Sequence, residues 1–371
     1  MKIKTITCHD VYNYGASLQA YALQHYLELL GHDVEVIDYK PDYLSGHYKF
    51  WFVPQSNRYY SLCKKSKLFH LLYCLRLAPE TFRTWRRIKP FNLFKKNRLK
   101  CTSLVYKSNE ELKKVPPVAD LYIAGSDQIW NCLLPNGKDE AFFLGFGNNN
   151  TRRISYAASF AMSEIPEEYR CLISNYMSHL DAISVRETSG VSICESMGYK
   201  ATQALDPVFL LSGDEWRNFA GPKIHHGHYI LIYNLFKNTS SIIKQHACQL
   251  KSKKGWEIIA VNDVNVCKFA DKNYNGMGPI EFVNLIANAS YVIADSFHAT
   301  AFSTILHIPF SVYYQNKNSA RMIDFLSTVN LLKCFNPSEL TQDYNWDEVQ
   351  KMLDQSLIKS KNFLTNFTAE Q

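Results

Sequence analysis

Short apolar segments that end in polar residues recur through the chain, and stretches with helical spacing separate them. The expected strands are Ile3–Thr7, Val34–Asp38, Asp120–Ala124, Ile154–Phe160, Leu180–Val185, Tyr229–Tyr233, Glu257–Val261, Tyr291–Ala294 and Phe310–Tyr314. After the first of them, Leu18, Ala22 and Tyr26 recur at the spacing of one helix face. Because this alternation is typical of doubly wound parallel sheets, the pattern predicts an α/β fold.

The alternation runs in two series, which predicts two domains. A single core rarely grows past ~250–300 residues, and the chain has 371. We expect a first domain over residues 1–205 and a second over 206–345, divided at Asp206-Pro207, with a crevice between them. A basic helical insertion is expected at about 44–115, and an amphipathic helix within 346–371 can pack back on the first domain.

Positive charge is concentrated in the insertion. Residues 58–100 contain 13 Lys and Arg but a single acidic residue, Glu80, whereas the rest of the chain is net acidic. Leucine and aromatic residues lie among these charges. The segment can therefore bind an anionic membrane surface, or it can be an insertion with one buried and one solvated face. Because no nucleic-acid-binding motif accompanies the charge, we expect no nucleic-acid partner.

From three further features we expect a cytoplasmic protein. It has no run of 18 uncharged apolar residues, and its first residues lead directly into a strand, without room for a secretion signal. Its ten cysteines form no CxxC pair and have no zinc-ligand spacing to histidine. We expect reduced thiols, no cofactor and no metal, with Cys8 as the one candidate nucleophile. The basic segment would allow peripheral contact with the inner face of the membrane.

Parallel sheets bind ligands beyond the carboxyl ends of their strands, and polar residues stand at these positions. They are Gly15, Asp127, Ser159, Arg186, Asn234, Asp263 and His298. The loop that contains Asn13 and Gly15 opens a helix, whose free N–H groups attract anions. Asn13 either caps that helix or contacts a ligand. One glycine makes neither a dinucleotide fingerprint nor a phosphate-binding loop.

The charged candidates also allow two interpretations each. Arg186 ends a buried strand, where it pairs with Glu187 or holds an anionic substrate group. Asp127 is a general base or caps its turn. His298 is structural or titrates in catalysis. Arg321 supplies a second positive group or lies on the surface.

Six segments occur in the order ITCHDVYNYGASLQAYALQ, LYIAGSDQIWN, ISVRE, DPVFLL, ADSFHATAFS and IPFSVYY. Together they resemble the polysaccharide pyruvyl transferase family, over about residues 1–40 and 118–330. The resemblance implies a GT-B-like fold of two Rossmann-like domains that face a cleft. It also implies transfer of an enolpyruvyl unit from phosphoenolpyruvate to two hydroxyls of a sugar, on a glycan or its lipid- or nucleotide-linked precursor.

The resemblance extends to single residues. Arg186 matches a family arginine and would bind an anionic group, while His298 matches the family histidine and would contact phosphate or transfer a proton. Ser126 and Ser296 are further candidate substrate contacts, and Asp127 is the candidate base because of its place in the cleft.

The chain departs from the family at one position. Some members have an arginine two residues before the histidine, where this chain has Ser296. One anion contact is therefore either missing or replaced by Arg321 or Lys317. Two other functions therefore remain open. One is a sugar-nucleotide glycosyltransferase of GT-B type, and the other is a non-catalytic protein that binds glycans or anions.

Overall fold

The first half of the chain builds a parallel sheet. In this computed structural model, residues 1–46, 50–53, 57–148, 150–262, 266–314, 320–340 and 343–368 are described. The sheet has the order β3-β2-β1-β4-β5. Its strands are β1 (Lys2–Ile6), β2 (Asp33–Tyr39), β3 (Cys101–Tyr106), β4 (Leu121–Ala124) and β5 (Arg152–Ser155). Single bridges, Ile154 to Ala182 and Ala158 to Val185, continue it toward the parallel pair β6 (Ile183–Val185) and β7 (Ala201–Gln203).

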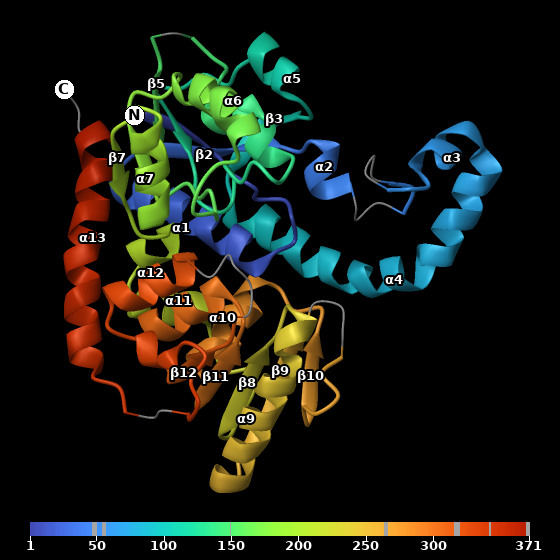
Figure 1. Cartoon of the computed structure of the whole chain (residues 1–371), viewed down its shortest axis with the longest axis vertical. Coiled ribbons are helices and arrows are strands. Elements are labelled where there is room, and N and C mark those ends of the chain that lie inside the picture. The colour runs from blue at the N-terminus through green and yellow to red at the C-terminus, as the bar shows by residue number, and fades with distance from the viewer. Residues whose placement is uncertain are drawn as a thin grey trace.

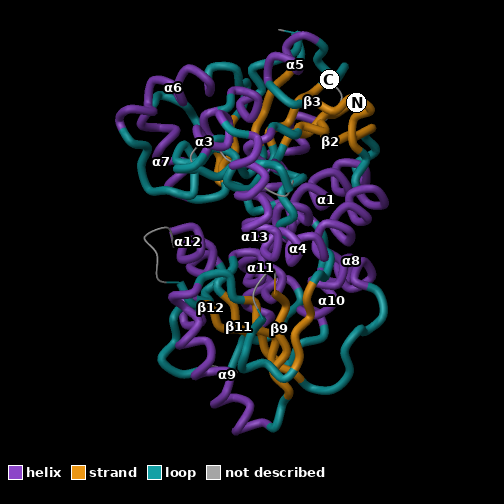
Figure 2. Tube along the Cα trace, turned by 90° about the vertical axis from the view of Figure 1, so that its right-hand side faces the viewer, coloured by secondary structure: helices purple, strands orange, loops and turns teal. Residues whose placement is uncertain are grey.

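The second half repeats the same connectivity. Its parallel sheet has the order β10-β9-β8-β11-β12. The strands are β8 (Tyr229–Tyr233), β9 (Glu257–Asn262), β10 (Lys272–Asn275), β11 (Tyr291–Ala294) and β12 (Phe310–Val312). The α/β prediction is confirmed. Figure 2 shows the two sheets in separate lobes joined by a helical waist.

Helices cover both sheets and join the lobes (Figure 1). They are α1 (Tyr14–Leu29), α2 (Asp42–Ser45), α3 (Tyr60–Lys65), α4 (Lys67–Arg98), α5 (Asn109–Lys114), α6 (Glu167–Met177), α7 (Thr188–Ser196), α8 (Gly213–Ala220), α9 (Ser240–Lys254), α10 (Pro279–Ala287), α11 (Phe297–Ile305), α12 (Ala320–Thr328) and α13 (Trp346–Thr368). The last helix runs back along the first lobe, where the Leu205 N–H donates to Ser360 Oγ at 2.9 Å.

Aromatic packing joins α1 of the first lobe to α10 of the second. The ring of Tyr14 is fully buried and stacks on Phe282, with 4.4 Å between centroids and 4° between planes. Its hydroxyl donates to the Met277 carbonyl at 3.1 Å, so the buried polar atom is satisfied. Phe91 of α4 packs on the same tyrosine with 5.2 Å between centroids. The start of α1 is therefore fixed against both the second lobe and the insertion.

The insertion is shorter than predicted. Residues Cys101–Tyr106, within the expected 44–115 helical segment, form the edge strand β3, and α5 follows them. Three consecutive side chains of this strand are exposed, so it lacks the apolar run that marked the buried strands. Within the described residues, no helix is both long and apolar enough to cross a bilayer.

Charged groups attach α4 to the first sheet. Lys95 Nζ lies 2.6 Å from Asp38 Oδ1 and 3.4 Å from Asp10 Oδ1, while His9 Nε2 lies 2.9 Å from Asp38 Oδ1. Burial works to raise the pKa of Asp38, but its contacts with His9 and Lys95 outweigh burial and hold the pKa well below its ordinary value. The carboxylate thus stabilises the fold in its charged form.

We predict that Lys95→Met lowers the free energy of unfolding by about 1.5–3 kcal/mol at neutral pH, because charge-assisted hydrogen bonds are lost. A depressed carboxyl pKa stabilises the fold above the ordinary pKa of ~3.9, and this contribution disappears as the pH falls. Chemical denaturation below about pH 5 should therefore show a smaller loss of stability on acidification in the variant. The exposed neighbour variant Lys96→Met is the control, and an equal effect from both would contradict the prediction.

Candidate active site

A cavity of about 360 Å³ lies where both sheets reverse their strand order. Parallel sheets form binding crevices at such points, between β1 and β4 in the first sheet and between β8 and β11 in the second. The loops after these four strands, Tyr314 and the start of α12 all contribute side chains. The lining residues are Cys8, Val11, Asn13, Leu44, Asp127, Gln128, Leu134, Asn136, Leu235, Phe236, Asp295, Ser296, Phe297, His298, Tyr314, Arg321 and Met322.

His298 reaches the cavity from the first turn of α11 and meets α1 of the first lobe. Its side chain is 11% exposed. A Cβ atom added to Gly15 would lie only 1.9 Å from its Nδ1 atom, so a residue without a side chain is required at position 15. Gly15 was predicted as a ligand contact, but it lines neither cavity described for this site. In the structure it makes room for the imidazole.

A buried carboxylate that the sequence interpretation treated only as a domain boundary stands behind His298. Oδ2 of Asp206 accepts hydrogen bonds from Arg186 Nη1 at 2.7 Å and Ser126 Oγ at 3.1 Å. The same oxygen lies 3.5 Å from His298 Nε2. Burial alone would raise the pKa of Asp206, but His298 and Arg186 hold it well below its usual range. The DPVFLL segment was the available signal, although no role was assigned to its first residue.

Arg186 lines a second cavity, of about 430 Å³, next to the first. Phe297 and Arg321 line both cavities, and the Arg186 guanidinium carbon lies 4.7 Å from the Phe297 ring centroid. The Arg186 side chain is 3% exposed, and within the described residues its Nε and Nη2 atoms have no hydrogen-bond partner. Nε lies 3.9 Å from Glu187 Oε2. The predicted pairing with Glu187 is therefore looser than the hydrogen bond to Asp206.

Arg321 brings a further positive charge to the wall between the cavities. With the Gln128 amide oriented to satisfy its neighbours, its oxygen accepts from both terminal nitrogens of Arg321 at 3.0 Å. Burial and the nearby Arg186 charge lower the pKa of Arg321. Two guanidinium groups held close together form a site for an anion. Lys317 and Asp263, two other predicted candidates, lie outside the described residues.

The remaining candidates occupy different places. Asp127 lines the first cavity in the left-handed backbone region, at φ 73°. Asn13 Oδ1 accepts from Ala16 N–H at 3.2 Å, so Asn13 caps α1, and it also lines the cavity. Ser296 lines the cavity at the start of α11. Ser126 is fully buried and lines neither cavity. Its hydroxyl donates to the Asp206 carboxylate.

Asp295, which the sequence interpretation missed, fixes the loop after β8. Its carboxylate accepts from the Leu235 and Phe236 N–H groups at 2.7 and 2.8 Å and from the Asn234 side chain at 2.7 Å. Burial raises its pKa although these hydrogen bonds work in the opposite direction. Asn234 was predicted as a site residue, and its amide serves this loop.

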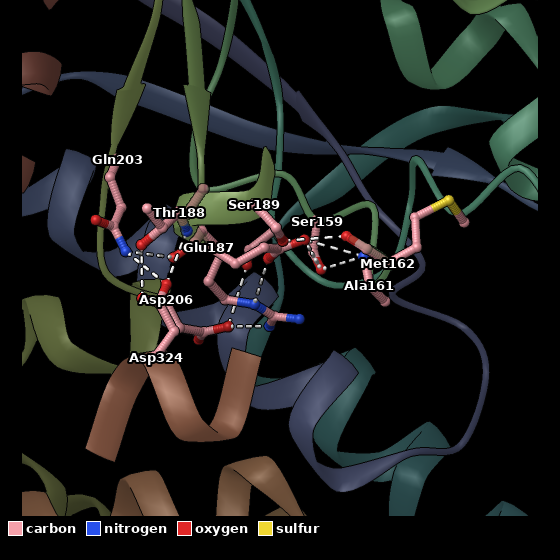
Figure 3. Close-up of polar contacts among 12 residues, drawn as sticks. Ser159, Ala161, Met162, Glu187, Thr188, Ser189, Gln203, Asp206 and Asp324 are labelled. Atoms are coloured by element: carbon pink, nitrogen blue, oxygen red, sulfur yellow. Dashed lines mark hydrogen bonds and ion pairs between the residues drawn. The ribbon is translucent and has the colours of Figure 1, made fainter. Parts of the chain in front are cut away.

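A carboxylate from the second lobe, Asp324, binds residues of the first lobe (Figure 3). Asp324 of α12 accepts from the Thr188 N–H at 2.7 Å, the Thr188 hydroxyl at 2.5 Å and Gln203 Nε2 at 2.9 Å. Nearby, Glu187 Oε1 accepts from Ser159 Oγ and from the Ala161 N–H, both at 2.9 Å. Asp324 therefore binds the first turn of α7 across the lobes.

Two cysteines bear on nucleophilic and metal chemistry. Burial, with the nearby Asp127 carboxylate, raises the pKa of Cys8 well above its ordinary value, which favours the unreactive thiol. Donor atoms of His9, Asp38 and Cys101 lie within 4.8 Å of one another, as a metal site would need. However, burial raises the pKa of Cys101 to about 11, and Lys95 already neutralises Asp38. These residues therefore suit a charge network better than a divalent cation.

The sequence model that describes the polysaccharide pyruvyl transferase family matches residues 13–316 of this chain. The chain belongs to this family. The predicted family and its enzyme class, a transferase, are thereby confirmed. None of the curated proteins matches the chain in sequence.

Solved structures with a similar fold include UDP-GlcNAc 2-epimerases. One is the UDP-GlcNAc 2-epimerase of Neisseria meningitidis bound to UDP-GlcNAc, at 11% identity over 100% of both chains and a TM-score of 0.51. Another is the UDP-GlcNAc 2-epimerase of Methanocaldococcus jannaschii, at 11% identity over 100% of both chains and a TM-score of 0.50. At this identity the likeness shows the fold alone. It confirms the GT-B-like arrangement of two Rossmann-like domains in this pyruvyl transferase family member.

Because Gly15 and His298 lie so close, we expect a Gly→Ala substitution here to lower stability, the opposite of its usual effect in a helix. Gly→Ala inside a helix ordinarily stabilises by about 1 kcal/mol, but Gly15→Ala should destabilise by about 1–3 kcal/mol because the new methyl group overlaps the imidazole. The loss should disappear in the His298→Ala background, which removes the overlapping atoms. Chemical denaturation of the four proteins of this double-mutant cycle measures the coupling. Additive effects would show that the two residues are not in contact.

Proposed function

We propose that the protein transfers an enolpyruvyl unit from phosphoenolpyruvate to two hydroxyl groups of a saccharide, which is a glycan or a glycan precursor, and forms a cyclic pyruvate ketal. The observation that supports this most is that His298, Arg321 and Asp127, which come from both lobes, line one cavity in a chain of the pyruvyl transferase family. An imidazole, a cation and a carboxylate are the groups that this reaction needs.

The chemistry requires no oxidant or reductant. A proton adds to C3 of the donor while one saccharide oxygen forms a bond to C2 and loses its proton to a base. The C2–O bond to phosphate then breaks, and the second hydroxyl oxygen attacks C2 and loses its proton to the departing phosphate. The products are the ketal and inorganic phosphate. Anion-binding groups stabilise the donor and the departing phosphate, and a positioned acid and base move the protons.

We assign roles by position in the cavities. Arg321 and Arg186 hold the carboxylate and phosphate groups of the donor between them, with help from the N-terminal N–H groups of α11 beside Ser296. His298 transfers the proton to C3 or contacts the phosphate. Asp127 accepts the hydroxyl proton. Arg321 thereby takes the place of the cation that is absent at Ser296.

The proposal is tested by mixing the protein with phosphoenolpyruvate and a panel of saccharide acceptors. We expect phosphate release together with a saccharide product heavier by one pyruvyl ketal, measured by mass spectrometry. A parallel panel of UDP-sugars tests the glycosyltransferase alternative, for which sugar transfer without use of phosphoenolpyruvate is the expected result. Binding of glycan or donor without turnover in either panel would support the non-catalytic alternative.

His298 should be needed for turnover and not for folding. We expect His298→Ala to lower kcat by about 100-fold or more, the usual contribution of a positioned acid or base. Its melting temperature should fall by only a few degrees, since about 1 kcal/mol corresponds to roughly 2–4 °C in a large domain. His298→Gln stays inactive if the role is proton transfer and recovers partly if the role is a hydrogen bond. A stable and active His298→Ala protein would remove the residue from the mechanism.

For Arg186 the informative variant is Arg186→Lys, which keeps the charge beside Asp206 and loses the planar fork. We expect kcat/KM for the donor to fall nearly as far as in Arg186→Ala. In both variants the loss of transition-state stabilisation should be about 2–4 kcal/mol. Stability should separate the two variants, because only Arg186→Ala leaves the buried Asp206 carboxylate without its cation. Near-normal turnover of the lysine variant would contradict a donor contact.

A further inference from the structure

We propose that the arm formed by α3 and the outer half of α4, residues 57–78, binds the surface of an anionic lipid bilayer. Figure 1 shows this part of the chain projecting away from both lobes. The inner half of α4 packs on the body instead, where Phe91 and Phe94 are each 3% exposed. The arm therefore presents a surface that the packing of the lobes does not need.

The outer face of α4 carries a stripe of exposed leucines. Leu68, Leu71, Leu72 and Leu75 follow the spacing i, i+3, i+4 and i+7, which places them on one side of a helix. They are 67, 37, 57 and 52% exposed, respectively. Ordinarily such a stripe faces a protein core. On this arm it faces outward, as in helices that lie in a membrane interface.

The arm has its own small hydrophobic core on the face of α4 opposite the leucines, so the exposed leucines are not needed to hold the arm together. Cys74 of α4 is 1% exposed and packs with Cys63 of α3 and with Val53. Phe69 and Tyr73 of α4 pack against the same cluster. One side of the helix therefore holds the arm together, and the leucine side is available for a partner.

The charge of the arm selects an anionic partner. Residues 57–78 contain five Lys or Arg side chains and no Asp or Glu. Lys64 and Lys65 are exposed at the end of α3, and Lys67 is exposed at the start of α4. Two copies of this surface would bring like charges together, whereas the anionic headgroups of a bilayer attract them while the leucines enter the acyl boundary.

Not every basic residue of the insertion belongs to this surface. The Arg87 side chain is buried, with its guanidinium carbon 5.2 Å from the Tyr14 ring centroid and 5.1 Å from that of Phe91. Lys95 is held by Asp38. These two residues therefore do not belong to the proposed membrane surface, which we place on the arm rather than on the whole 58–100 stretch that the sequence indicated.

Flotation of the full chain with vesicles tests the proposal. We expect at least tenfold stronger binding to vesicles of phosphatidylcholine with about a third phosphatidylglycerol than to phosphatidylcholine alone, with steep weakening as salt is raised. Lys64→Glu with Lys65→Glu should reduce binding at least tenfold, and so should Leu72→Ser with Leu75→Ser. The control pairs an exposed valine and an exposed isoleucine elsewhere, Val118→Ser with Ile358→Ser, and should bind as the wild type does.

We expect every variant to melt within about 2 °C of the wild type, because the substituted sites are exposed, so that a change in binding does not reflect unfolding. Equal binding to neutral and anionic vesicles, no binding at all, or equal loss in the control variant would each overturn the proposal. So would a wild-type dimer in light scattering that Leu72→Ser with Leu75→Ser converts to a monomer, because the leucines would then face a second copy.

Discussion

The carboxylate of Asp206 is the contact on which the arrangement of the candidate site depends. It is fully buried in the link between the lobes and receives Ser126 from the end of β4 and Arg186 from the end of β6. His298, from the other lobe, lies beside the same oxygen. A buried charge is costly unless it is paired, so Arg186 and Ser126 stabilise the carboxylate, and the carboxylate in turn orients the arginine. A single acidic side chain thus links strand ends of one sheet to a helix of the other.

Much of the architecture could be predicted because buried parallel strands leave a clear signal. The bounds expected for β8 and β11 agree with the structure, since both strands are apolar on both faces and end at polar residues. The rule that ligands bind at carboxyl ends of strands then selected Asp127 and His298, which do line one cavity. In this way, local pattern and general topology identified residues far apart in the chain that the fold brings together.

The features that sequence could not supply are those set by long-range contacts. β3 was missed because an edge strand with exposed side chains lacks the apolar run of a central strand. Gly15 gave no local sign that its missing side chain leaves space for an imidazole more than 280 positions away. Asp206 and Asp324 were not selected as site residues, because their significance lies in which atoms they meet across the lobes. Arg321 could equally have been a surface residue until its cavity was known.

Helix α12 has a consequence for motion between the lobes. Arg321 and Asp324 stand three residues apart on it, one lining the cavity and the other bound to the first turn of α7. The helix therefore connects the cavity, through Arg321, to α7, through Asp324. A rotation that widened the cleft by moving α12 away from α7 would carry the guanidinium out of the cavity and uncover the Thr188 amide in the same movement. The same helix therefore supplies both the Arg321 charge at the cavity and the Asp324 contact between the lobes.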